Sequence, residues 1–256
     1  MRSAPMAKQR PQQTLRVLLI GDSIANGAWW TDQDQTMSAL MQGQLKSAVG
    51  NGFESVEVLN ASANSWSPRN EVEYLRKFGV FDSQAVVLLI NTDDLFGIAP
   101  NSLQVGRDRN YPSQKPPLAL VEVLTYFVLP QKPIPGFKEA QSEKGDRVGF
   151  NLKAIEEIQA IANESNTTLI LAMTPLLREI GQPGPRDYEV EARKRLQEVT
   201  EAQQIPYLDF LPVFNATEAP ETLFRDNIHL SPKGNQLVSE TIVKSLIQQG
   251  ITENPY

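Results

Sequence analysis

Short runs that are apolar at almost every position alternate along this chain with longer segments whose apolar residues recur at helical spacing. Continuous apolar runs of strand length indicate strands that are buried on both faces, and their alternation with helices is typical of a parallel sheet covered on both sides. The pattern therefore predicts an α/β protein. The expected strands are residues 15–21, 56–60, 85–91, 168–174 and 206–210, and the expected helices are residues 36–49, 69–78, 148–164, 188–203 and 232–249.

These elements form one expected domain, residues 15–250. A polar and basic stretch, residues 1–14, precedes it and is expected to be disordered, and a short tail, residues 251–256, follows it. A proline-rich insertion at about residues 95–147 interrupts the alternation and contains one apolar segment, residues 118–129. Because the insertion follows the carboxyl end of a strand, where ligands bind in open α/β sheets, it can be a lid or a wall of a substrate pocket. A helix packed on the core between proline-rich connections fits its sequence equally well.

The composition excludes several classes of catalytic and metal-binding site and argues against some classes of partner. The chain has 24 Lys and Arg against 30 Asp and Glu, a net charge of −6, which argues against a partner that is a nucleic acid or an anionic membrane. It has no cysteine and a single histidine, His229, which excludes a thiol nucleophile, an iron–sulfur cluster and a multi-histidine metal site within one chain. We expect no metal and no cofactor. No apolar run suits a signal peptide or a transmembrane segment, so we expect a cytoplasmic protein.

A sharp turn with an exposed hydroxyl is expected where the first strand ends. The strand continues directly into Gly21, Asp22, Ser23 and Ile24. A glycine followed closely by a small hydroxyl residue turns the chain and leaves that hydroxyl at the edge of the sheet. Ser23 can act there as a nucleophile or as the N-cap of a helix, and these residues alone do not decide between the two roles.

The only imidazole of the chain stands three residues after a carboxylate, in the loop that leads into the last expected helix. The loop contains Asp226, Asn227, Ile228 and His229, and Ser231 is placed to cap the helix. A short loop allows Asp226 to accept a hydrogen bond from one ring nitrogen of His229, so that the other nitrogen can take a proton from a hydroxyl. Taken alone, His229 can equally be an ordinary loop histidine.

The two segments together, Gly-Asp-Ser-Ile at residues 21–24 and Asp-Asn-Ile-His at residues 226–229, resemble the SGNH (GDSL-type) family of serine esterases and acylhydrolases. The resemblance covers roughly residues 15–250. It implies a three-layer α/β/α, flavodoxin-like sandwich with a central, mostly parallel five-stranded sheet. It also implies a catalytic triad of Ser23, His229 and Asp226.

The resemblance further implies an oxyanion hole, where this chain departs twice from the family pattern. The backbone N–H of Ser23 is one implied donor. The family commonly has a glycine donor after the second strand, where this chain has Ser65, whose N–H serves if the residue adopts the required dihedrals. After the third strand, Asp93 replaces the asparagine whose amide usually donates. An ionised carboxylate has no proton to donate and repels the negative charge that develops in the transition state.

Three explanations of the aspartate are open. Asp93 can be protonated, with its pKa raised by burial and by neighbouring Asp94, and donate as a neutral acid. Asn64 or Asn91 can supply the missing amide. Alternatively, the site has lost its hydrolytic power and binds a ligand instead.

We therefore expect a serine ester hydrolase that takes a small-molecule acyl ester, with short acyl esters of sugars or small alcohols as the first choice. The alternatives are a lysophospholipase- or thioesterase-type acylhydrolase, to which the apolar segment 118–129 points, and a catalytically weakened binding module on the same fold. Asn64, Asn91 and Trp66 are possible pocket residues. Trp29 and Trp30 can line an acyl or sugar pocket or simply pack.

Overall fold

The protein was analysed as a computed structural model that describes residues 6–7, 9–49, 52–109, 111, 113–114, 117–130 and 133–253. Residues 1–5 and 8 of the expected lead-in and residues 254–256 of the expected tail lie outside the described residues. The chain forms two compact units. One comprises Met1–Gly97 and Arg147–Tyr256, and the other comprises Ile98–Asp146.

A five-stranded sheet lies at the centre of the larger unit, and every strand pairing in it is parallel. The strand order is β2-β1-β3-β4-β5, which confirms the predicted α/β class and the number of strands. Gly21, the last residue of β1, pairs with Ser62 of β2 and with Leu89 of β3, so these three strands end at the same edge. The strands are β1 (Thr14–Gly21), β2 (Ser55–Ser62), β3 (Ala85–Asn91), β4 (Thr168–Thr174) and β5 (Tyr207–Asp209).

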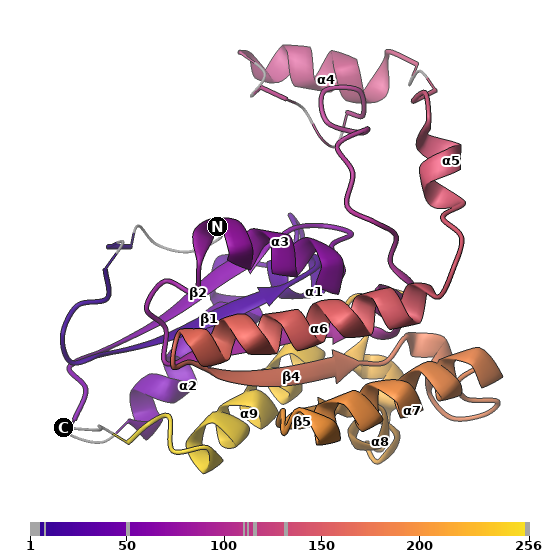
Figure 1. Ribbon diagram of the computed structural model, residues 1–256. Helices are drawn as coiled ribbons and strands as arrows, with labels where there is room; N and C mark the ends of the chain where they lie inside the picture. The colour runs from indigo at the N-terminus through magenta and orange to yellow at the C-terminus, as the bar shows by residue number, and fades with distance from the viewer. Residues whose placement is uncertain are drawn as a thin grey trace. The chain divides into compact units, whose positions relative to one another are not determined.

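Helices cover both faces of this sheet, as Figure 1 shows. Alternate residues of β1 point to opposite faces: Leu15, Val17 and Leu19 belong to one core cluster, whereas Leu18 and Ile20 belong to the other. The first cluster includes residues of α2 (Met37–Ala48), α8 (Phe210–Asn215) and α9 (Pro232–Gln248). The second includes residues of α3 (Pro68–Phe78), α6 (Arg147–Glu164) and α7 (Asp187–Ala202).

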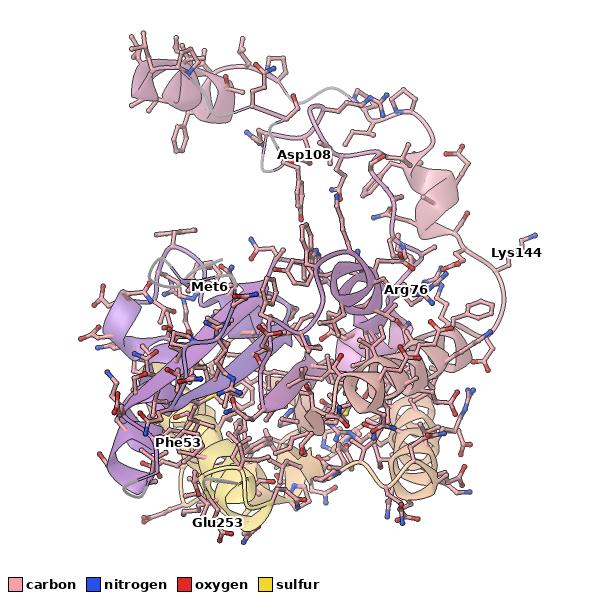
Figure 2. All side chains as sticks on the ribbon, turned by 60° about the vertical axis from the view of Figure 1, so that its left-hand side comes forward. Met6, Phe53, Arg76, Asp108, Lys144 and Glu253 are labelled. Carbon is pink, nitrogen blue, oxygen red and sulfur yellow. The ribbon has the colours of Figure 1, made fainter. Side chains whose placement is uncertain are left out.

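An ion pair at the surface of the larger unit also links α3 to α6. Arg76 of α3 donates a hydrogen bond to Glu157 of α6 at 2.7 Å, and Figure 2 labels this arginine among the side chains of the larger unit. With helices on both faces of one sheet, the larger unit is the predicted three-layer α/β/α sandwich.

The predicted elements agree with the structure to within one or two residues, and their ends have identifiable causes. Ser231 caps α9 by accepting the Gly234 N–H at 3.2 Å, and Gly250 follows the helix with a φ of +71°. The prediction of a strand over residues 206–210 is wrong at its end. Phe210 begins α8, because Asp209 accepts the Leu211 N–H at 2.9 Å and starts a helix there.

The first residues of the larger unit are partly tied to it. Thr14, which the sequence places in the lead-in, begins β1. The carbonyl of Ala7 accepts a hydrogen bond from buried Arg16 at 3.1 Å, and the side chain of Arg10 donates to the carbonyl of Asp82 at 2.9 Å.

The smaller unit contains two helices among its described residues, α4 (Ala119–Phe127) and α5 (Phe137–Gln141). Apolar side chains of α4, including Leu120 and Phe127, are exposed. Over the described parts of both units, no helix combines the length and the apolar character that crossing a membrane requires. The remaining short helical turns are α1 (Ser23–Asn26), η1 (Gln33–Gln35), η2 (Thr92–Phe96), η3 (Leu177–Glu179) and η4 (Pro220–Leu223).

Candidate active site

The turn after β1 holds Ser23 at the carboxyl edge of the sheet. Gly21 is required there, because a Cβ atom at this position would lie 2.4 Å from the carbonyl oxygen of Leu89. Asp22 caps α1 by accepting the Ile24 N–H at 2.8 Å, which leaves Ser23 as the first residue of this short helix. The chain therefore turns sharply around a half-buried hydroxyl.

The loop before α9 brings the imidazole of the chain to this hydroxyl. His229 Nε2 lies 3.0 Å from Ser23 Oγ, and His229 Nδ1 lies 2.9 Å from Asp226 Oδ2. Asp226 Oδ1 also accepts the backbone N–H groups of Ile228 at 3.0 Å and His229 at 2.9 Å. Two segments separated by 206 residues thus meet in the Asp226–His229–Ser23 order that the family resemblance implies.

The electrostatic state of Asp226 suits this arrangement. Burial by itself raises the pKa of Asp226, but the backbone N–H groups of His229 and Ile228 and the His229 ring together outweigh burial, so the pKa is lowered. The carboxyl group is therefore ionised at neutral pH. An ionised acceptor on Nδ1 fixes that nitrogen as the donor and leaves Nε2 free to accept the hydroxyl proton.

Trp30 holds the imidazole from another side. Its ring packs edge-on against His229, with centroids 4.7 Å apart and planes at 68°. The guanidinium carbon of Arg225 lies 4.8 Å from the Trp30 ring centroid. The backbone N–H of Arg225 donates to the backbone carbonyl of His229 at 2.8 Å. The sequence leaves Trp30 undecided between packing and pocket, whereas the structure places its ring in contact with the histidine.

A buried acidic cluster, made of Asp22, Glu71 and Asp94, lies behind the serine. Asn91 connects two of its members: its side-chain amide donates to Asp22 Oδ2 at 2.9 Å and to Asp94 Oδ2 at 2.8 Å. Burial raises the pKa of Asp22 to about 6, against opposing hydrogen bonds and the charge of His229. Burial, with added repulsion from Asp22, raises the pKa values of Glu71 and Asp94 well above their ordinary values.

Glu71 is the member of this cluster that the sequence analysis missed. Its side chain is fully buried, and neither carboxyl oxygen has a hydrogen-bond partner among the described residues. Helical spacing could have indicated that Glu71 is buried. It lies four residues before Leu75 and next to Val72, and both of these residues face the core.

Among the candidate oxyanion donors, Ser65 adopts a backbone conformation that favours glycine, the residue common at this position in the family. Its φ of +61° lies in the left-handed region, which glycine enters without steric cost. Ser65 and Asn64 are both exposed. The Trp66 ring packs instead against Tyr74, with centroids 5.4 Å apart, and is half-buried.

The two candidate oxyanion donors at the end of β3, Asn91 and Asp93, differ in whether their side chains can donate a hydrogen bond. Both amide hydrogens of Asn91 are used by Asp22 and Asp94, so in this structure Asn91 does not offer a free donor. Asp93 is exposed, and its N–H donates to Asn91 Oδ1 at 2.8 Å. Partial burial raises the pKa of the Asp93 carboxyl, although nearby Arg178 opposes the shift.

The groups that meet at this edge are a hydroxyl, an imidazole and a carboxylate in hydrogen-bond contact, at the place on a parallel sheet where α/β enzymes bind ligands. Over the described ranges, no group of three or more His, Cys, Asp or Glu side chains is placed to hold a metal ion.

The fold and this arrangement are typical of an α/β hydrolytic enzyme. Residues 19–237 match the model of the GDSL-like lipase/acylhydrolase family, which is most of the chain. The chain belongs to this family of ester-hydrolysing enzymes, and the resemblance noted from its two motifs is confirmed.

Solved structures of similar fold include other members of this class. The acetyl xylan esterase AlAXEase is 14% identical with a TM-score of 0.59, and the match covers 91% of this chain and 100% of that one. A lipase/acylhydrolase from Enterococcus faecalis is 16% identical with a TM-score of 0.53, covering 92% and 96% of the two chains. TesA is 16% identical with a TM-score of 0.57, covering 90% and 97%. No curated protein matches the chain in sequence.

Proposed function

We propose that this protein hydrolyses carboxylic esters through an acyl-enzyme formed on Ser23. The observation that carries the proposal is the continuous hydrogen-bonded line from Asp226 through His229 to Ser23, with contacts of 2.9 and 3.0 Å. A serine hydroxyl is a weak nucleophile until an adjacent base takes its proton, and this geometry supplies the base.

In the first half of the proposed reaction, Ser23 Oγ attacks the ester carbonyl carbon while His229 Nε2 takes the hydroxyl proton. Asp226 stabilises the resulting imidazolium through its contact with Nδ1. The tetrahedral intermediate collapses when His229 gives this proton to the leaving alcohol oxygen. In the second half, His229 takes a proton from water while the water oxygen attacks the acyl carbon. The bond from this carbon to Ser23 Oγ then breaks, and His229 gives the proton to Ser23 Oγ as the acid leaves.

The proposed oxyanion donors are the backbone N–H groups of Ser23 and Ser65. The left-handed φ of Ser65 supports its part, because this is a conformation that the family's glycine enters without steric cost. For the third donor, the occupied amide of Asn91 leaves two candidates: Asn64, which is exposed, and Asp93, which donates only when its carboxyl group is neutral. A neutral carboxyl group can donate one hydrogen bond.

Short acyl esters of sugars or small alcohols are the proposed substrates. The likeness in fold to the acetyl xylan esterase supports this class. A second class, esters with longer acyl chains or thioesters, is favoured by the likeness to the Enterococcus faecalis lipase/acylhydrolase.

A fluorophosphonate probe tests the proposal directly, because it reacts covalently with activated serines. Wild-type protein should be labelled and should hydrolyse p-nitrophenyl acetate, whereas Ser23→Ala should do neither. Ser47→Ala is a matched control, since Ser47 is exposed on α2 and its hydroxyl donates to the Gly43 carbonyl of the same helix. Wild-type protein that is neither labelled nor active would favour the non-catalytic binding module instead.

A further inference from the structure

Trp29 stands beside the candidate active site with 87% of its side chain exposed, the highest value among the large apolar side chains that the structure describes. Its ring packs edge-on against Trp30, with centroids 5.7 Å apart and planes at 78°, and Trp30 in turn packs against His229. Exposing an indole to water forfeits the free energy that its burial would release. An indole left open this close to reacting groups is therefore a candidate ligand contact.

The backbone directs the two tryptophans to this place at a steric cost. Gly27 and Ala28 both adopt a left-handed conformation, with φ values of +71° and +42°, and this turns the chain back after α1. Asn26 holds the turn, because its Oδ1 accepts the Ala28 N–H at 3.2 Å and its amide donates to the Ser62 carbonyl at 3.3 Å. An alanine in the left-handed region carries a steric cost, which the hydrogen bonds of this turn offset.

The mechanism of ester hydrolysis determines which part of a substrate lies against the Trp29 and Trp30 rings. The carbonyl oxygen must point to the oxyanion donors, whereas the oxygen of the leaving alcohol must reach His229 Nε2 to receive its proton. Trp30 contacts the His229 ring directly, so the groups that border this histidine border the alcohol portion of the substrate.

We propose that Trp29 and Trp30 form a subsite for the alcohol portion, and that this portion is a sugar ring; the proposal rests on the ester hydrolase function above. The surface of Trp30 is partly taken by Arg225 and His229, which leaves Trp29 as the open platform. A flat indole packs well on the apolar C–H face of a pyranose, and the exposed guanidinium of Arg225 offers donors to ring hydroxyls. A linear alcohol presents no comparable face.

Acetate release from two esters tests the subsite: acetylated methyl glucopyranoside, whose alcohol is a ring, and glyceryl triacetate, whose alcohol is linear. Trp29→Ala should raise KM for the sugar ester by about two- to tenfold, the range that one aromatic contact provides. It should leave kcat/KM for glyceryl triacetate within about twofold, and Trp29→Phe should restore most of the sugar preference. Phe78→Ala is the control, because Phe78 is a half-exposed ring at the end of α3.

An equal loss with both esters would overturn the proposal, since it would assign Trp29 to the turn rather than to the sugar. Calorimetric titration of Ser23→Ala protein with the acetylated glucoside separates the two proposals. If binding weakens in Ser23→Ala/Trp29→Ala, the subsite stands even where the wild-type protein hydrolyses no ester. If binding does not weaken, the subsite is refuted even where glyceryl triacetate is hydrolysed.

Discussion

Glu71 provides the sharpest test of the buried acidic cluster, through the substitution Glu71→Gln. Glutamine has the shape of glutamate but no titratable proton. The pKa of Glu71 is raised well above its ordinary value of 4.5, chiefly by burial and then by the charge of Asp22. The folded protein therefore keeps this proton over a pH range in which the unfolded chain has released it.

The sign and size of the effect follow from linkage. For each pH unit between 4.5 and the raised pKa, the free energy of unfolding of the wild-type protein falls by up to about 1.4 kcal/mol on account of this one group. The variant lacks this slope. Its stability relative to that of the wild-type protein should therefore rise steadily as pH rises above 4.5, on top of any constant difference that the buried amide adds.

Urea unfolding at a series of pH values from about 4.5 to about 7.5 measures the difference. Glu73→Gln is the matched control, because Glu73 lies on the same helix with its side chain 57% exposed, and this change should shift stability by less than about 0.5 kcal/mol at every pH. A stability difference for Glu71→Gln that is constant across the series would refute the assignment of Glu71 as a buried acid that stays protonated.

Three further substitutions probe the site itself. Above the raised pKa of Asp93, Asp93→Asn should raise kcat for p-nitrophenyl acetate by at least about tenfold, because one oxyanion donor is worth about 10²–10³ in a serine protease. Wild-type activity should also fall as pH rises through that pKa, and a rate that the substitution leaves unchanged above it would place Asp93 outside the oxyanion hole. Ser65→Gly should keep activity and exceed Ser65→Ala in stability by about 1 kcal/mol, measured by denaturant unfolding, because only glycine removes the left-handed strain; equal stabilities would contradict this. Asp226→Asn should lower kcat by about 10⁴, as the same change does in a serine protease, and a loss below about tenfold would argue against its orienting role.

Much of the fold is contained in the apolar pattern. The bounds of β3 and β4 were predicted to the residue, because both are continuous apolar runs with polar residues on either side. β5 has three residues, all of them half-buried, so periodicity gave it no sharp end, and the cap formed by Asp209 decided where α8 begins. The segment Ile98–Asp146 forms a unit of its own, and no periodicity in the sequence indicates how such a segment packs.

The site divides in a similar way. Ser23, Asp226 and His229 could be predicted together because their two motifs resemble those of the SGNH family, and the structure places these side chains in hydrogen-bond contact. The burial of Glu71 was missed because a glutamate on a surface helix is normally solvated, and only tertiary packing reverses this. The use of the Asn91 amide by two carboxyl groups likewise depends on contacts between residues distant in sequence, which a single sequence does not contain.

The single imidazole also allows the state of the site to be followed by nuclear magnetic resonance without ambiguity of assignment. With one histidine in the chain, one pair of imidazole carbon-bound protons appears in the spectrum, and it needs no assignment by mutagenesis. Because the Trp30 ring lies 4.7 Å from the His229 ring at 68°, its ring current displaces those two signals from their ordinary positions. A ligand that moves either ring should therefore change the chemical shifts of these two His229 signals.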